Sequence, residues 1–264
     1  MPRRPRWARL RGSRGRKYGH NEVMSLARGT DAEYTVRDQE RMTAATRYFA
    51  WQSRLASREV GSRIVEVGCG IGNFTAMLAD RELVVGLDVE ASCVEKHRQR
   101  FRDCGNIRSQ VMDAGAPEFR SLAAHRPDSV VCLNVLEHIE DDALALSNIA
   151  SILEERGKVI LIVPAFQALY GPIDARLGHY RRYDKRGFAA LARRAGLNIV
   201  RLNYMNSVGF IGWWMNARLL PREAQSESQI LIFDRLVVPV MSRLEAWVRP
   251  PFGQSIFAVL EKRC

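Results

Sequence analysis

The sequence lacks the cysteine pattern of a zinc site or of a disulfide framework. Its 264 residues include five cysteines, none of which forms a C-x-x-C pair or clusters with histidine. They stand at positions 69, 93, 104, 132 and 264. We therefore expect no bound metal and no disulfide scaffold. Cys132 lies in an apolar run and is expected to pack in the core.

Long apolar runs are also missing. No stretch reaches the roughly 18 residues that a transmembrane helix needs, and the N-terminus carries charge without the apolar core of a signal peptide. With 47% hydrophobic and 26% charged residues, the composition is that of an ordinary globular protein. The length suits one α/β domain with one elaboration. The expected location is the cytoplasm, with peripheral contact to the inner membrane face as an alternative.

Acidic residues are absent from residues 1–17, which hold seven arginines and one lysine. This segment carries +8 of the formal net charge of +11, so the remaining chain is nearly balanced. A segment rich in Arg, Pro and Gly cannot bury a core, and we predict a basic disordered tail over 1–30 and a single domain over 31–264. The tail is either a solvated extension or a contact for nucleic acid or an anionic membrane. No specific nucleic-acid partner is expected.

A glycine-rich turn follows the first predicted strand, at 63–67. The β-branched residues of that strand favour a buried parallel strand. Gly68, Gly70 and Gly72 then lead into a helix predicted at 73–80. A strand that passes through glycines into a helix brings backbone N–H groups to one point, which suits a nucleotide-like ligand.

Two features of this turn argue against a dinucleotide. In a G-x-G-x-x-G turn the third glycine would fall at Asn73. Glu66, two residues before Gly68, would repel a pyrophosphate and attract an ammonium group. The turn therefore predicts a ligand with a cationic amino-acid end.

Strand and helix signals alternate after the turn. Further strands are predicted at 83–88, 107–112, 129–134, 158–164, 197–203 and 255–261. Helices are predicted at 38–58, 92–101, 142–153 and 185–195, and 165–182 is predicted to be a loop. Such alternation implies a parallel sheet with ligands at the carboxyl ends of its strands.

The acid followed by G-x-G-x-G at 66–72 resembles the first motif of the class I S-adenosylmethionine (SAM) methyltransferases. The resemblance covers roughly 38–204 and 255–261 and is greatest to the bacterial small-molecule branch, which includes quinone-type methyltransferases. It implies an α/β fold: a Rossmann-like, seven-stranded, mostly parallel sheet with helices on both faces. A helical insert is expected between strands six and seven, and SAM is the implied cofactor.

The resemblance also implies the cofactor residues. Asp88, twenty residues after Gly68, is expected to accept hydrogen bonds from ribose hydroxyls. Val89 is expected against the adenine ring and Asp113 at its amino group. The full set is Glu66, Gly68, Cys69, Gly70, Gly72, Asp88, Val89, Asp113, Ala114 and Asn134.

Two histidines are candidate catalytic bases. His138 lies in a Leu-Glu-His segment typical of the family's fourth motif, and His179 lies in the loop after strand five. Either could have a near-neutral pKa and accept a proton. The alternatives are that His138 only shapes the pocket and that His179 only anchors its loop. Asp141 and Asp142 are expected to cap a helix rather than to bind a metal.

The acceptor is less well defined. Tyr180, Arg181 and Tyr183 are candidates for binding an anionic or sugar-like substrate. The insert, 205–252, is predicted to cap the active site with Trp213 and Trp214, although a membrane surface or a dimer contact would also suit it.

The leading functional hypothesis is methylation of oxygen, nitrogen or carbon in a small molecule of secondary metabolism. The alternatives are methylation of a lipid-linked or polysaccharide substrate at the membrane and, less favoured, a non-catalytic SAM-fold module. Asn134-Val-Leu-Glu replaces the Asn/Asp-Pro-Pro-Tyr motif used on exocyclic amines, which disfavours that chemistry.

Overall fold

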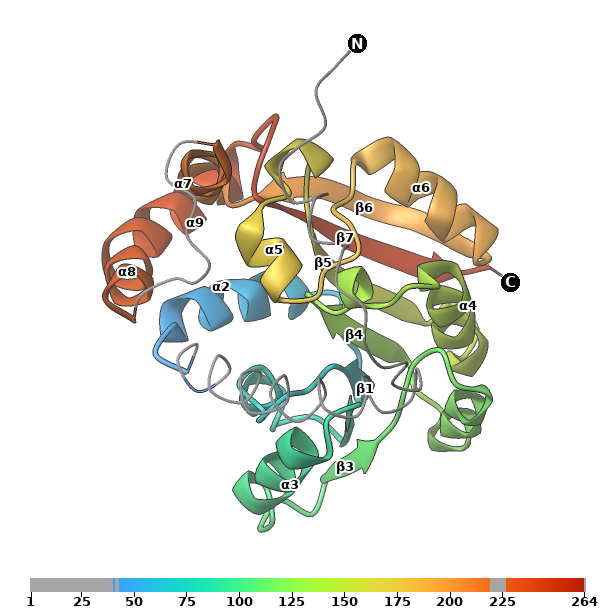
Figure 1. Ribbon diagram of the computed structural model, residues 1–264. Coiled ribbons are helices and arrows are strands. Elements are labelled where there is room, and N and C mark those ends of the chain that lie inside the picture. Colours follow the sequence, from blue (N-terminus) through green and yellow to red (C-terminus); the bar gives the residue numbers. More distant parts are fainter. Residues whose placement is uncertain (1–39, 41–42, 219–226, 264) are drawn as a thin grey trace, which may run out of the picture. The chain divides into compact units, whose positions relative to one another are not determined.

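The structure is a computed structural model that describes residue 40 and residues 43–218 and 227–263. The predicted basic tail at 1–30 lies outside the described residues. Seven strands form one sheet in the order β3-β2-β1-β4-β5-β7-β6 (Figure 1). They are β1 (Arg63–Val67), β2 (Leu83–Asp88), β3 (Ile107–Val111), β4 (Ser129–Leu133), β5 (Lys158–Pro164), β6 (Leu197–Met205) and β7 (Ser255–Lys262).

Strand β7 runs antiparallel to both of its neighbours, and all other strand pairs of the sheet are parallel. The predicted mostly parallel sheet is therefore confirmed. Because successive side chains point to opposite faces, β1 sends Val65 to one core and Ile64 to the other. Both faces of the central strands are buried, which explains their continuous apolar runs.

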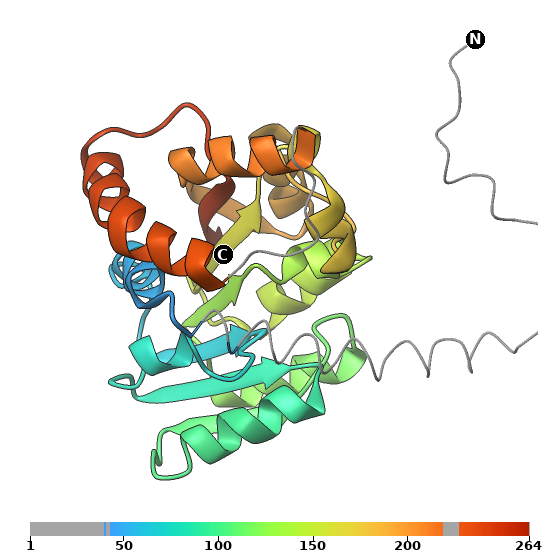
Figure 2. The same ribbon diagram turned by 60° about the vertical axis from the view of Figure 1, so that its left-hand side comes forward.

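Helices cover both faces of the sheet, as predicted (Figures 1 and 2). The 3₁₀ segment η3 (Pro117–His125) and the helices α4 (Asp142–Ile152) and α6 (Lys185–Arg194) pack on the core that contains Val65. The opposite face is covered by α2 (Thr46–Ala56), α3 (Ala91–Arg100) and α9 (Val238–Trp247). Asp141 and Asp184 cap α4 and α6 by accepting from backbone N–H groups of Leu144 and Gly187.

The prediction of a helix at 73–80 is wrong. This stretch forms a single 3₁₀ turn, η2 (Thr75–Met77), before the chain enters β2. The Thr75 hydroxyl donates to Glu66 at 2.6 Å and lies 2.9 Å from the His97 ring nitrogen Nε2. These contacts draw Thr75 into the core, and they override the local helical preference.

The loop predicted at 165–182 contains two short helices. They are η5 (Gln167–Leu169) and α5 (Pro172–Arg176). Pro172 occupies the first turn of α5, where no backbone N–H is needed. The Asp174 carboxylate accepts from the backbone N–H of Gly171 at 3.0 Å and closes the start of the helix.

The insert between β6 and β7 is helical, as predicted. It comprises α7 (Ser207–Arg218), α8 (Glu227–Ile232), a π-helical turn (Phe233–Val237) and α9. Two of its acids cap other helices. Asp234 accepts from the backbone N–H groups of Arg47 and Tyr48 at 3.2 and 2.8 Å, in the first turn of α2. Glu245 accepts from the backbone N–H groups of Asn206 and Ser207 at 2.9 and 2.8 Å, at the start of α7.

Replacing Asp234 by alanine should lower the free energy of unfolding by about 1–2 kcal/mol, since α2 loses its capping acceptor. The side chain is buried, so the freed N–H of Tyr48 would gain little from water. Urea denaturation measures the change. Asp80→Ala is the matched control, because Asp80 is exposed and pairs with its neighbour Arg81. Equal stability of the two variants would contradict the capping role.

In the part of the chain that the structure describes, no helix combines the length and the apolar character needed to cross a membrane.

Candidate active site

The glycine turn lies at the carboxyl end of β1 and is fixed by the neighbouring strand β2. The backbone N–H groups of Gly68 and Cys69 both donate to the carbonyl oxygen of Leu87 at 2.8 Å. Gly68 has φ = +75°, and a Cβ placed there would lie 2.1 Å from Val135. The turn therefore requires glycine at this position, and it packs directly against the segment that follows β4.

Asp88 closes the turn from the end of β2. Its carboxylate accepts from the backbone N–H of Gly70 at 2.9 Å and from that of Glu90 at 2.9 Å. Burial raises the pKa of Asp88, while these N–H donors act in the opposite direction. One acid thus ties the glycine turn to the start of α3.

Glu66 lies beneath the turn in a buried polar chain. It accepts from Thr75, which contacts His97, and His97 Nδ1 lies 2.7 Å from the Ser109 hydroxyl. Burial raises the pKa of Glu66 to about 8, and the hydrogen bond from Thr75 opposes this rise. Without a ligand cation nearby, this carboxyl therefore keeps its proton at neutral pH.

A second group of titratable residues follows β4. Glu137, His138 and His179 bring one ligand atom each to within 4.8 Å of one another, and we call them the acceptor-side trio. The two histidine rings meet edge to face with their centroids 4.5 Å apart. The backbone N–H of Tyr180 donates to the Glu137 carbonyl at 2.8 Å, which joins the loop after α5 to the segment after β4.

The trio combines a proton-bearing carboxyl with a neutral ring. Burial raises the pKa of Glu137 to about 8, and its buried Oε2 has no hydrogen-bond partner among the described residues. Desolvation by the surrounding protein, together with the electrostatic effect of His179, lowers the pKa of His138 to about 4. The near-neutral pKa expected for His138 is therefore wrong. His138 is nevertheless exposed to solvent.

Asp174 orients the second histidine. Its buried carboxylate contacts His179 Nδ1 at 2.9 Å and accepts from Arg182 Nε at 2.9 Å. Burial alone would raise the pKa of Asp174, but His179 and Arg182 hold it below its ordinary value. Because the ionised carboxylate only accepts, Nδ1 of His179 carries a proton in this contact, which fixes the orientation of the ring.

Known proteins are similar to this chain in both sequence and fold. A family model described as "Methyltransferase domain" matches residues 38–202. The chain belongs to the class I SAM-dependent methyltransferase family. It is an enzyme, its cofactor is SAM, and its strand order is that of the class I fold.

One relative of the methyltransferase is the ubiquinone biosynthesis O-methyltransferase of Xanthomonas euvesicatoria pv. vesicatoria (strain 85-10). It is 30% identical over an alignment of 179 positions that covers 61% of this chain and 72% of the relative. Another relative of the same name, from Aeromonas salmonicida (strain A449), matches over 42% of its length.

Two solved structures support the fold. A Haloferax volcanii methyltransferase in complex with the Trm112 methyltransferase activator has a TM-score of 0.60, with 88% of this chain and 95% of that chain covered. The N-methyltransferase NodS from Bradyrhizobium japonicum WM9, in complex with S-adenosyl-L-homocysteine, has a TM-score of 0.51, with 83% and 86% covered. Both are 17% identical to the methyltransferase.

The other expected cofactor residues of the methyltransferase lie around the same strand ends. Cys69 and Ala114 are buried, whereas Val89 is 61% exposed and free to meet a ligand ring. The Asp113 carboxylate accepts from the backbone N–H of Gly115 at 2.7 Å and forms a turn. Asn134 has φ = +55° and donates its backbone N–H to Ile162.

The candidate substrate residues Tyr180, Arg181 and Tyr183 differ in exposure and in their contacts. Tyr183 is buried, and its hydroxyl donates to Asp142 at 3.0 Å, so its expected role in substrate binding is corrected to a core role. Arg181 pairs with the same Asp142 at 2.8 Å. Tyr180 is 53% exposed and keeps its ring accessible.

Trp213 of the insert contacts Asp174, the residue that orients His179 of the acceptor-side trio. Its indole Nε1 donates to Asp174 at 3.3 Å, and the Arg182 guanidinium lies 4.9 Å from its ring centroid. Trp214 is exposed, and no contact of its side chain with this network is seen among the described residues. The helix α7 is thus joined to the carboxylate that orients His179.

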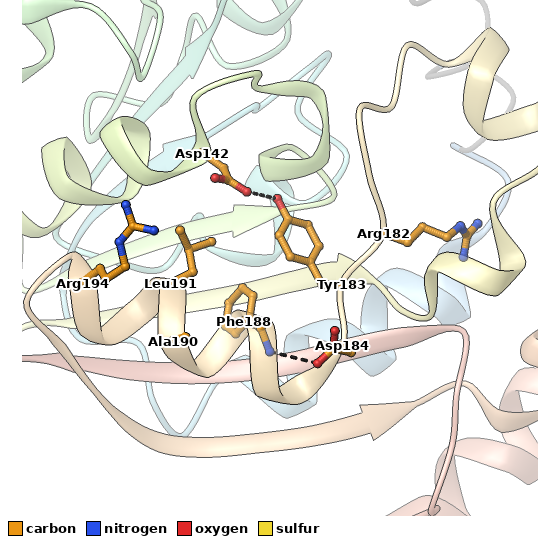
Figure 3. Close-up of a pocket in the computed structure, with 9 residues that line it drawn as sticks. Asp142, Arg182, Tyr183, Asp184, Phe188, Ala190, Leu191 and Arg194 are labelled. Atoms are coloured by element: carbon orange, nitrogen blue, oxygen red, sulfur yellow. Dashed lines mark hydrogen bonds between the residues drawn. The ribbon is translucent and has the colours of Figure 1, made fainter.

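A groove of about 310 Å³ lies beside α6, and Asp142, Arg182 and Tyr183 are among the residues that line it (Figure 3). Figure 3 shows Tyr183 pointing toward Asp142, while Arg182 points away from both. No residue of the trio and none of the expected cofactor residues lines this groove. We therefore do not assign the acceptor to it.

The trio also has the composition of a divalent-metal site. A metal would first have to displace the proton that burial keeps on Glu137. We retain the prediction of a reaction without metal, which a chelator can test.

Sequence reasoning missed Asp174, the acid that contacts His179, Arg182 and Trp213. It gave no signal, because it stands in a segment predicted to be a loop.

Proposed function

We propose that this methyltransferase methylates a hydroxyl oxygen of a small-molecule acceptor in secondary metabolism. The observation that carries the proposal is the acceptor-side trio, in which a neutral histidine ring stands beside a protonated carboxyl. A hydroxyl must lose its proton during methyl transfer, whereas a preformed anion or a free amine need not. The printed function of the relatives, O-methylation in ubiquinone biosynthesis, supports the same acceptor atom.

In this proposal His138 accepts the proton of the acceptor hydroxyl. His179 is the alternative base, and Asp174 holds its ring so that Nε2 can accept. Glu137, with its proton retained, can donate a hydrogen bond to an acceptor oxygen. When bound, SAM supplies an activated methyl group. The residues of this chain orient the acceptor and move its proton.

The strand ends form the proposed cofactor site. The glycine turn offers backbone N–H groups, and Asp88 offers oxygens to ribose hydroxyls. Val89, Asp113, Ala114 and Asn134 are proposed for the adenosine side. Glu66, Gly68, Cys69, Gly70 and Gly72 are proposed for the turn and the amino-acid end. An ammonium group near Glu66 would favour the ionised carboxylate and so lower its pKa.

We propose that the acceptor enters between Tyr180 and the insert, 205–252, which serves as the cap. The bond from Trp213 to Asp174 supports this placement, since it brings α7 beside the trio. Trp214 would act at the entrance, where it is exposed. Arg181 is proposed to hold its loop through Asp142 and to meet an acceptor only at its rim.

A second candidate function is methylation of a lipid-linked or polysaccharide acceptor at a membrane surface. The exposed apolar side chains of the insert favour it. It uses the same site and the same acceptor atom, and it differs only in what carries the hydroxyl.

The test is methyl transfer from labelled SAM to a matched panel consisting of a phenol, its methyl ether and the corresponding aniline. We expect label on the phenol alone, with the methyl ether as the control for carbon methylation. Label on the aniline but not on the phenol would contradict the proposal. The same panel with a long alkyl chain, presented in detergent, separates the soluble acceptor from the lipid-linked one.

A further inference from the structure

The helical run 227–247 of the insert carries an exposed apolar stripe. Its members within the helix recur every three or four residues and so share one side of the helix. They are Ile232, Leu236, Val240, Leu244 and Trp247, with exposures of 59%, 67%, 58%, 63% and 90%, and Val248, which is 68% exposed, directly follows the end of the helix. We call this set the outer stripe.

The opposite side of the same helix is already buried. Val238 and Met241 pack into the core shared with α2, and Asp234 and Glu245 cap α2 and α7. A surface helix in a globular protein normally turns a polar side to water. This helix is apolar on both sides, so the outer stripe is not needed for packing the described core.

Among residues 228–249, the exposed charged side chains beside the outer stripe have one sign. Arg235, Arg243 and Arg249 are exposed. The two acids of residues 228–249 are engaged elsewhere: Asp234 is buried against α2, and Glu245 is bonded at the start of α7. The outer side of this described helix therefore offers apolar groups and cations together.

We infer that the outer stripe docks on an anionic lipid surface and presents the active site to an acceptor carried in that membrane. Apolar side chains with interleaved arginines and a highly exposed tryptophan fit the boundary between headgroups and acyl chains. A second copy of this chain fits less well, because a symmetric contact along the stripe would bring like charges together. The acceptor class, an amphiphile with a membrane-borne tail, rests on the second candidate function under Proposed function, but the docking itself does not.

The link between this surface and the site is structural. Glu245, on the docking helix, bonds the start of α7, and Trp213 on α7 bonds Asp174. Docking would therefore hold the cap beside the trio, where a hydroxyl headgroup could enter while its tail stays in the lipid.

The test uses the full chain and sedimentation with vesicles of phosphatidylcholine alone or mixed with phosphatidylglycerol. We expect binding to the mixed vesicles that weakens with salt, and a blue shift of tryptophan emission that is lost in Trp247→Phe. The double variant Leu236→Ser/Leu244→Ser should bind at least about tenfold more weakly. Val111→Ser/Val200→Ser is the matched control, since both valines are similarly exposed on strands.

The basic N-terminal segment is present in every variant, so it cannot account for a difference between them. Equal vesicle binding by Leu236→Ser/Leu244→Ser and the parent would assign binding to that segment and overturn the proposal. Absence of parent binding would also overturn it, as would a concentration-dependent dimer lost in the double variant. Vesicle binding without methyl transfer to any hydroxyl acceptor would instead leave the docking standing and refute the proposed function.

Discussion

Replacing His138 by alanine is expected to lower kcat by about 10²–10⁴ while leaving SAM affinity nearly unchanged. The ring lies in the acceptor-side trio, beside His179 and next to Glu137, whose Oε2 has no hydrogen-bond partner among the described residues. Steady-state rates and SAM titration calorimetry measure the two quantities separately. His125→Ala is the matched control, because that histidine ends η3 and belongs to neither site.

The pH profile sharpens this prediction. A base must be neutral, so activity falls as the pH drops through its pKa. Since the pKa of His138 is lowered to about 4, the parent rate should stay level from about pH 8 to pH 5 and fall below that. An acidic limb near 6.5 that persists in His138→Ala would rule out His138 as the base. Activity lost with a chelator and restored by a divalent ion would assign the trio to a metal.

Replacing Asp88 by alanine is expected to weaken SAM binding by roughly 2–3 kcal/mol, about 30–150-fold in Kd. The variant loses the oxygens proposed for the ribose hydroxyls. It also frees the N–H groups of Gly70 and Glu90, which shape the turn. Asp88→Asn keeps one acceptor oxygen and should be intermediate.

Asp103→Ala is the control for this variant, because Asp103 is an exposed acid that pairs with its neighbour Arg102. Calorimetry with SAM, and a melting curve of each variant without ligand, separate a binding defect from unfolding. If Asp88→Ala binds SAM as tightly as the parent, the cofactor does not occupy the ends of β1 and β2.

Local sequence signals determined most of the sheet. The bounds predicted for strands 63–67, 83–88 and 158–164 are those observed, because these buried strands are rich in β-branched and aliphatic residues. Asp184 was predicted to cap its helix, and it does so. The glycine turn with its preceding acid sufficed to indicate the family that the comparisons show.

Contacts between residues distant in the sequence decided the rest. Thr75 does not lie in the predicted α-helix, because its hydroxyl is hydrogen-bonded to Glu66 and His97 inside the core. Tyr183 looked like a substrate residue, yet its hydroxyl meets Asp142, 41 positions away.

The sequence by itself determined the succession of the seven strands along the chain, and it predicted the cofactor turn and both candidate histidines. Only the tertiary structure brought His138 against His179, placed Asp174 behind the second ring and lowered the pKa of the first. The reason is physical: a pKa depends on which atoms surround a group and exclude water from it. Residues 138 and 179 acquire those surroundings only when the ends of β4 and β5 meet on the same edge of the sheet.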